Sequence, residues 1–255
     1  MASALFDLSG RTALITGSSR GLGYAIARGL GQAGASLILN GRDEARLLAS
    51  ATALCKEGLS VRTAAFDVTD EAAVVDAFAR FDQDDLEVGI LVNNAGIQLR
   101  KPLVDLSVAE WDKVLSTNLT SAFVVGREAA RRMIPRGRGK VINIASLTSE
   151  MARATVAPYT AAKGGIKMLT RSMATEWAEL GLQANAIGPG YMITDMNEAL
   201  VNDPKFDAWV KDRTPARRWG RPEELVGAAV FLASAASDYV NGQVIYVDGG
   251  MLSAL

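Results

Sequence analysis

The sequence has 255 residues, of which 49% are apolar and 22% charged, and its formal net charge at pH 7 is −1. These values are typical of one large globular α/β domain, and the small charge excludes a global attraction to nucleic acid or to an anionic membrane surface. The sequence contains no histidine and one cysteine, Cys55, which excludes Ser-His-Asp catalysis, histidine or cysteine metal sites and an intrachain disulfide.

Seven short apolar stretches are predicted to be strands, at residues 11–16, 35–40, 61–66, 88–92, 140–145, 183–187 and 243–247. Helices are expected between them, over 21–33, over about 43–57, and from a cap at Asp70 to about residue 81. Buried strands that alternate with helices predict a parallel sheet with helices on both faces. We expect a doubly wound α/β fold of about seven strands (a Rossmann fold) in a single domain over 1–255, with the substrate site built from its C-terminal half.

The chain offers no sign of export or of membrane insertion. No stretch approaches the roughly 20 apolar residues that a membrane span needs. The first residues lack a basic region followed by an apolar run, so we expect no signal peptide and a cytoplasmic location.

The first strand is followed by a glycine-rich turn that opens a helix. Such a turn can bend tightly, and its backbone can approach a pyrophosphate at the helix N-terminus, where the helix dipole favours an anion. Glycines also simply end strands, but the position of this cluster in a βαβ unit indicates a dinucleotide site. The candidate cofactor residues of the turn are Gly17, Ser19, Arg20, Gly21, Leu22 and Gly23.

The end of the second strand predicts which nicotinamide cofactor binds. An enzyme that selects NAD places Asp or Glu there to bind the ribose 2′-hydroxyl. This chain has Asn40-Gly41-Arg42 instead, and Arg20 adds a second guanidinium group. Arginine binds a phosphate bidentately, so Arg20 and Arg42, with no competing acid, favour NADP. The alternative is that Arg42 only begins the next helix and faces water.

Tyr159 and Lys163 are four residues apart, so on a helix they share one face. Pro158 indicates that the helix begins close to Tyr159, because proline is favoured in a first turn. A neighbouring ammonium group and a helix N-terminus both favour the phenolate, which would let this tyrosine exchange a proton near neutral pH. An ordinary surface Tyr/Lys pair is the alternative when these two residues are taken alone.

The glycine spacing, G-x-x-x-G-x-G, and the order of the motifs resemble the short-chain dehydrogenase/reductase family over essentially the whole chain. Asn118, Ser146, Tyr159 and Lys163 match its catalytic tetrad. The resemblance implies further cofactor contacts from Asp67 and Val68 at the adenine, from Asn94, Ala95 and Gly96 after the fourth strand, from Pro189, Gly190 and Thr194 over the nicotinamide, and from Tyr159 and Lys163.

The resemblance also implies a role for each member of the tetrad. Tyr159 exchanges a proton with the substrate oxygen, and Ser146 hydrogen-bonds to the same oxygen. Lys163 holds the nicotinamide ribose and lowers the pKa of Tyr159, while Asn118 holds a water that joins Lys163 to solvent. Taken singly, Ser146 could be a strand-end cap and Asn118 a helix kink.

Longer stretches, at 93–98, 149–153, 213–220 and 247–251, resemble family members that act on a sugar acid, a small polar alcohol or ketone. Arg100 and, second, Arg153 are expected to bind its carboxylate, with Glu150 accepting from a hydroxyl or orienting Arg153. The alternative is that Glu150 and Arg153 pair only with each other. Leu99 and Thr148 differ from the residues usual in that group, so another polyol or ketone stays open.

Two other functions stay open. A 3-oxoacyl-carrier-protein reductase would use a basic patch for its acidic carrier, and Arg127, Arg131 and Arg132 offer a modest one. A non-catalytic NADP sensor on the same fold is less expected, because sensors often lose the Tyr or the Lys. The family resemblance implies a homotetramer, although core packing explains apolar residues such as Phe123 and Met168 equally well.

Overall fold

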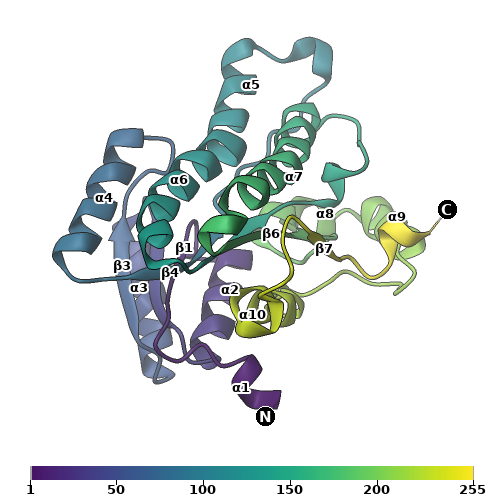
Figure 1. The fold of residues 1–255 in the computed structure, drawn as a ribbon. Helices are drawn as coiled ribbons and strands as arrows, with labels where there is room; N and C mark the ends of the chain where they lie inside the picture. The colour runs from purple at the N-terminus through teal and green to yellow at the C-terminus, as the bar shows by residue number, and fades with distance from the viewer. Residues whose placement is uncertain (1, 255) are drawn as a thin grey trace.

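Seven parallel strands form one central sheet in the computed structural model, which describes residues 2–254 (Figure 1). The order across the sheet is β3-β2-β1-β4-β5-β6-β7. The strands are β1 (Thr12–Ile15), β2 (Ser36–Gly41), β3 (Val61–Ala65), β4 (Val88–Asn93), β5 (Gly139–Ile144), β6 (Leu182–Pro189) and β7 (Val244–Val247). Each lies within two residues of its predicted bounds, and the predicted doubly wound fold is confirmed.

Helices follow the strands in the alternation that a parallel sheet requires. They are α1 (Ala2–Leu5), α2 (Gly21–Gln32), α3 (Glu44–Lys56), α4 (Glu71–Gln83), α5 (Val108–Leu115), α6 (Ser121–Met133), α7 (Ala157–Trp177), α8 (Glu198–Val201), α9 (Pro204–Arg213) and α10 (Val226–Ala233). A π-helical segment, Ser116–Thr120, joins α5 to α6. The predicted cap Asp70 accepts a hydrogen bond from the backbone N–H of Ala73, a contact worth about 1 kcal/mol.

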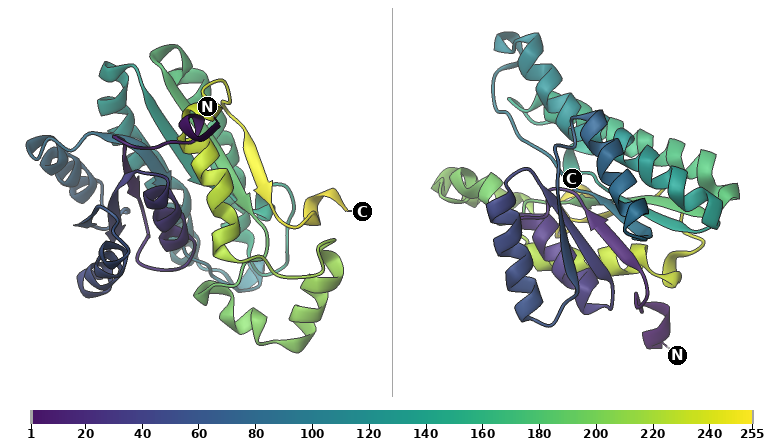
Figure 2. Two further views of the ribbon diagram at one scale, coloured as in Figure 1. Left: turned by 90° about the horizontal axis from the view of Figure 1, so that it is seen from below. Right: turned by 90° about the vertical axis from the view of Figure 1, so that its left-hand side faces the viewer.

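The core consists of two apolar layers, one on each face of the sheet. Figure 2 shows helices on both faces. Helices α2, α3 and α10 cover one face, and α4, α6 and α7 cover the other. Neighbouring residues of β1 show why both layers form: Ile15 packs into the first and Leu14 into the second, since successive side chains of a strand point to opposite faces. A sheet buried on both faces gives the continuous apolar strands seen in the sequence.

The strand order reverses at β1, which pairs with β2 on one side and with β4 on the other. In open parallel sheets the loops diverge at such a reversal and leave a crevice at the carboxyl ends of the strands. The segment after β6, which carries α8 and α9 (light green in Figure 1), lies at the same end and closes part of the crevice. No helix among residues 2–254 is long and apolar enough to cross a bilayer.

Candidate active site

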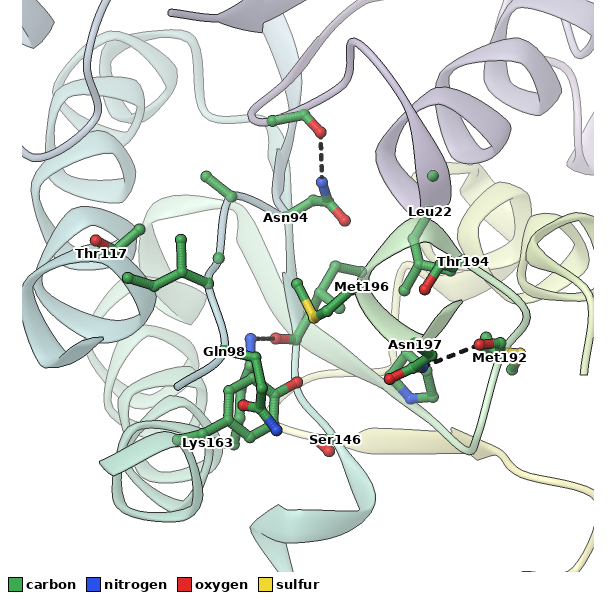
Figure 3. A pocket seen from close by; sticks show the side chains of 18 of the residues that line it. Leu22, Asn94, Gln98, Thr117, Ser146, Lys163, Met192, Thr194, Met196 and Asn197 are labelled. Atoms are coloured by element: carbon green, nitrogen blue, oxygen red, sulfur yellow. Dashed lines mark hydrogen bonds between the residues drawn. The ribbon is translucent and has the colours of Figure 1, made fainter. Parts of the chain in front are cut away.

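A cavity of about 990 Å³ opens at the carboxyl ends of β1 to β6 (Figure 3). Its wall contains nearly all the site residues predicted from the sequence; the exceptions are Gly23, Asn118 and Glu150. The loops after β1, β2 and β3 form one half of the wall, and the loops after β5 and β6 form the other. The turn after β4 joins the two halves, so a dinucleotide site and a reaction site are continuous.

The glycine-rich turn after β1 is shaped for close approach of a ligand backbone. Gly17 has φ +62°, and a Cβ atom there would lie 2.9 Å from the Cα atom of Ala95. Helix α2 begins at Gly21 without a side-chain cap at its N-terminus. The first N–H groups of the helix therefore have no partner from a capping side chain, which suits a pyrophosphate.

Asn94 and Asn40 hold the strand ends together around this turn. The Asn94 amide donates to the carbonyls of Thr16 and Gly17, both at 2.9 Å. Figure 3 draws one of these two bonds. The Asn40 amide donates to Ala64 and Phe66 at 3.1 Å, and its oxygen faces the Gly17 N–H at 3.4 Å. Asn40 is buried, so its side chain organises β1, β2 and β3 rather than reaching far into the cavity.

The expectation that no acid competes for the two arginines is wrong. Asp67 Oδ2 lies 3.3 Å from an Arg42 nitrogen, and Asp195 Oδ2 lies 3.0 Å from an Arg20 nitrogen. Arg42 and Arg20 stay 74% and 60% exposed, and exposed pairs contribute only about 0–1 kcal/mol. A phosphate that accepts charged hydrogen bonds, worth about 1.5–3 kcal/mol each, can displace either carboxylate.

Ser146, Tyr159 and Lys163 line the other half of the cavity, where Figure 3 labels Ser146 and Lys163. Ser146 follows β5 with an extended backbone, and its hydroxyl caps the next turn by accepting from the Thr148 N–H at 3.2 Å. Tyr159 lies in the first turn of α7, next to the buried Pro158. The Lys163 ammonium lies one turn further on, donates to the Ile144 carbonyl at 2.6 Å and is 5.6 Å from the centroid of the tyrosine ring.

The acid–base shifts differ from those expected. Burial lowers the pKa of Lys163 to about 8, and it raises the pKa of Tyr159 against the opposing effects of the Ser146 hydroxyl and the Arg100 charge. The predicted lowering of the tyrosine pKa by Lys163 is therefore wrong for the protein chain by itself. Each group is shifted toward its neutral form, because the cavity replaces water that would solvate an ion.

Asn118 supports the cavity wall from behind. It lies in the π-helical segment, 2% exposed, where its side-chain oxygen accepts from the Ile97 N–H at 2.7 Å and its amide donates to the Ile97 carbonyl at 2.8 Å. Both polar ends of the side chain are thus used to hold the backbone turn at Ile97. The contact of Asn118 with a water stays a prediction. To bind a water, the side chain would have to use the same oxygen or amide that already bonds to Ile97.

Arg100 and Arg153 line the same half of the cavity from the loops after β4 and β5. Burial, and next the charge of the nearby Arg153, lower the pKa of Arg100. Among residues 4–254, neither guanidinium group has a carboxylate within ion-pairing distance. Two cations that line one cavity and repel each other form a good site for an anion.

Glu150 is not part of this wall, and its expected pairing with Arg153 is wrong. Its carboxylate is bound by the Lys167 ammonium of α7 and by the Tyr246 hydroxyl of β7, the latter at 2.6 Å. It therefore does not pair with Arg153, and its contact with a substrate hydroxyl stays a prediction. Lys167 and Tyr246 are far apart in the sequence. The packing of α7 against the end of the sheet brings both to Glu150.

The sequence prediction also missed several residues of the cavity wall, namely Gln98, Thr148, Tyr191, Trp209 and Arg213. Gln98 and Arg213 lie in stretches that were named only for their resemblance, and Thr148 was named only as a difference from the related group. A signal for the aromatic residues was present, since the otherwise polar stretch 203–219 contains Phe206, Trp209 and Trp219. Among residues 2–254 no three metal-ligating side chains gather as a metal site.

A parallel sheet with a glycine-rich turn, and a cavity that joins it to Ser, Tyr and Lys side chains, is the arrangement of a dinucleotide-dependent oxidoreductase. Comparison with known proteins shows the family to which the chain belongs. A family model described as enoyl-(acyl carrier protein) reductase matches residues 17–252, and the chain belongs to the short-chain dehydrogenase/reductase family.

Three relatives are similar over almost their whole length. Gluconate 5-dehydrogenase of Gluconobacter oxydans is 53% identical, over 98% of each chain. A structure from Agrobacterium tumefaciens, described provisionally as a gluconate dehydrogenase, is 66% identical with a TM-score of 0.98 and covers 98% of this chain and 99% of that chain. A gluconate 5-dehydrogenase from Burkholderia cenocepacia, in complex with NADP and tartrate, is 49% identical with a TM-score of 0.98 over 100% of both chains.

Proposed function

We propose that this protein is an NADP-dependent gluconate 5-dehydrogenase, which interconverts gluconate and 5-keto-gluconate. The observation that carries the proposal is the convergence of Arg100 and Arg153 in the cavity that also holds Ser146 and Tyr159. A carboxylate in such a cavity needs a cation or several donors, and these two groups supply both. The gluconate 5-dehydrogenases among its relatives support the same substrate.

The cofactor half of the cavity fits NADP. The N–H groups at the start of α2 would hold the pyrophosphate, and Arg42 and Arg20 would bind the 2′-phosphate in place of Asp67 and Asp195. Further contacts would come from Asp67 and Val68 at the adenine, from Asn94, Ala95 and Gly96, and from Pro189, Gly190 and Thr194 at the nicotinamide. The bound cofactor supplies the hydride.

In the reductive direction, Tyr159 donates the proton of its hydroxyl to the carbonyl oxygen of the substrate. The Ser146 hydroxyl donates a hydrogen bond to the same oxygen and stabilises its developing negative charge. Lys163 would hold the nicotinamide ribose and favour the phenolate that remains after the proton has left. Because burial raises the pKa of Tyr159, the tyrosine keeps its proton until negative charge develops on the substrate oxygen.

The alternative function, reduction of a 3-oxoacyl group on an acidic carrier protein, is less consistent with the charges on the surface. The three arginines that could have met an acidic carrier already have acidic partners: Arg127 pairs with Glu71, Arg131 with the buried Glu128, and Arg132 with Asp82. A patch neutralised in this way attracts an acidic partner only weakly.

A substrate panel tests the proposed function. NADPH oxidation is measured with 5-keto-gluconate, with an acetoacetyl thioester and with no substrate. We expect turnover with 5-keto-gluconate well above that with the thioester. The reverse order would support the carrier-protein alternative, and binding of NADPH without turnover of any ketone would support a sensor.

We also propose a cytoplasmic homotetramer with one domain per chain. Phe123 on α6 and Met168 on α7 are 45% and 56% exposed, and the two helices lie side by side on one face (Figure 1). A second copy would cover these apolar side chains. Light scattering of the purified protein measures the assembly directly, and a monomer would contradict this proposal.

A further inference from the structure

Four aromatic rings pack together in the segment that follows β6, and we call them the aromatic cluster: Tyr191, Phe206, Trp209 and Trp219. Tyr191 is central, with its ring centroid 5.5, 5.7 and 5.6 Å from those of the other three, in edge-to-face contacts. Phe206 and Trp209 also contact each other, at 5.3 Å. Tyr191 and Trp209 reach the cavity wall, while Phe206 lies behind it.

Arg153 approaches this cluster from the loop after β5. Its guanidinium carbon lies 4.9 Å from the centroid of the Phe206 ring, within the range of a cation–π contact. One of its nitrogens donates to the Tyr191 hydroxyl at 3.4 Å. The two contacts use one face and one edge of the guanidinium group, and its remaining N–H donors stay available to a ligand in the cavity.

The cluster is itself anchored. Trp219 is buried, and its indole N–H donates to Asp207 of α9 at 2.8 Å. Asp207 also accepts from Lys211 at 2.7 Å, one turn further along α9. A backbone bridge between Met192 and Gly220 connects the two ends of the segment. The face that Phe206 presents to Arg153 is therefore held by a rigid support.

Arg153 and Arg100 carry like charges and line the same cavity, so each repels the other. A free arginine side chain would turn toward water, away from a second cation. We propose that Phe206 and Tyr191 are positioning residues that hold Arg153 toward the cavity, so that the aromatic cluster sets the preference for a carboxylate-bearing substrate over a neutral one. This inference rests on the proposed function for the identity of the substrate.

Phe206→Leu tests the inference, because leucine keeps an apolar side chain but has no ring face. We expect KM for 5-keto-gluconate to rise about fivefold to thirtyfold with kcat within about twofold, and KM for a neutral ketone to stay unchanged. Phe206→Tyr keeps the ring and should restore the wild-type KM. A matched control is Tyr239→Leu, which removes an exposed aromatic ring outside the cavity wall and should leave both KM values unchanged.

Direct binding separates this inference from the proposed function. The Kd of tartrate is measured by calorimetry on the NADPH-loaded protein, for wild type, Phe206→Leu, Arg153→Ala and the double variant. We expect each single change to weaken binding, and Phe206→Leu to add nothing once Arg153 is absent, since both changes remove one contact.

Two outcomes would overturn the inference: additive effects in the double variant, or equal losses for the charged and the neutral ketone. Wild-type protein that binds tartrate with the expected coupling but does not turn over 5-keto-gluconate would overturn the proposed function alone.

Discussion

Lys163 contacts Tyr159 over the face of its ring, with the ammonium nitrogen 5.6 Å from the ring centroid. The four-residue spacing on α7 produces this stacking, and the ammonium group is directed to the Ile144 carbonyl instead of to the phenol oxygen. Both side chains are deep in the cavity, where burial disfavours the charged form of each. The chain therefore presents a protonated tyrosine beside a lysine that loses its proton readily.

Tyr159→Phe should keep the fold and NADPH binding but lower kcat by about 10²–10⁴, since only the transferable proton is removed. Steady-state kinetics measures the loss, and NADPH fluorescence measures the retained binding. Tyr246→Phe is the control, because that hydroxyl contacts Glu150 outside the cavity. Near-wild-type turnover in Tyr159→Phe would refute the assignment of the proton donor.

Lys163→Met should change how stability depends on pH. The pKa of Lys163 is lowered from 10.5 to about 8 in the folded chain, so between these values the unfolded chain binds more protons and the stability of the wild type rises with pH. Below about pH 8 the cost of the buried charge is fully present. Methionine does not titrate, and the variant lacks this contribution.

We therefore expect the free energy of unfolding of the wild type, relative to Lys163→Met, to increase from pH 8 to pH 10 by up to about 1.4 kcal/mol per pH unit. Urea unfolding of both proteins without cofactor at several pH values measures the difference. Parallel pH profiles for the two proteins would contradict the lowered pKa.

Arg42→Ala should raise KM for NADPH much more than KM for NADH, because only NADPH has a 2′-phosphate to bind. Loss of one charged hydrogen-bonding partner costs about 1.5–3 kcal/mol, so the preference should fall about tenfold to a hundredfold. Arg62→Ala is a matched control, since Arg62 pairs with Asp84 away from the cavity. Equal changes for both cofactors would show that Arg42 does not bind the phosphate.

Arg100→Ala should raise KM for 5-keto-gluconate about tenfold to a hundredfold and leave a neutral ketone almost unaffected, because a charged hydrogen bond to the carboxylate is lost. The neighbouring Lys101 provides a matched control: its ammonium pairs with Glu110 at 2.9 Å and lies outside the cavity wall. Lys101→Ala should therefore change neither KM. An equal effect of Arg100→Ala on both ketones would exclude it as the carboxylate ligand.

Features that depend on a few consecutive residues could be predicted from the sequence. The strand positions followed from short apolar stretches, and Asp70 was recognisable as a helix cap next to the helix that it begins. The spacing of Tyr159 and Lys163 placed both on one face of α7, because helix geometry alone fixes that relation.

Partners from distant parts of the chain could not be predicted in this way. Asp195 lies beside Arg20, 175 residues away, and Glu150 binds Tyr246, 96 residues away. Nothing in the sequence around either residue identifies its partner, because the order of the strands and the packing of the loops bring the two together. The same holds for the Arg153 contacts with Tyr191 and Phe206.

Tyr159 shows most clearly the difference between what the local sequence predicts and what the tertiary structure decides. The sequence alone indicated an ammonium group one helical turn away, and from it a lowered tyrosine pKa. The tertiary structure placed the phenol in a cavity that excludes much of the surrounding water, and burial raised its pKa. A neighbour four residues away is determined by the backbone of one helix, whereas solvation of a side chain depends on every segment that packs around it.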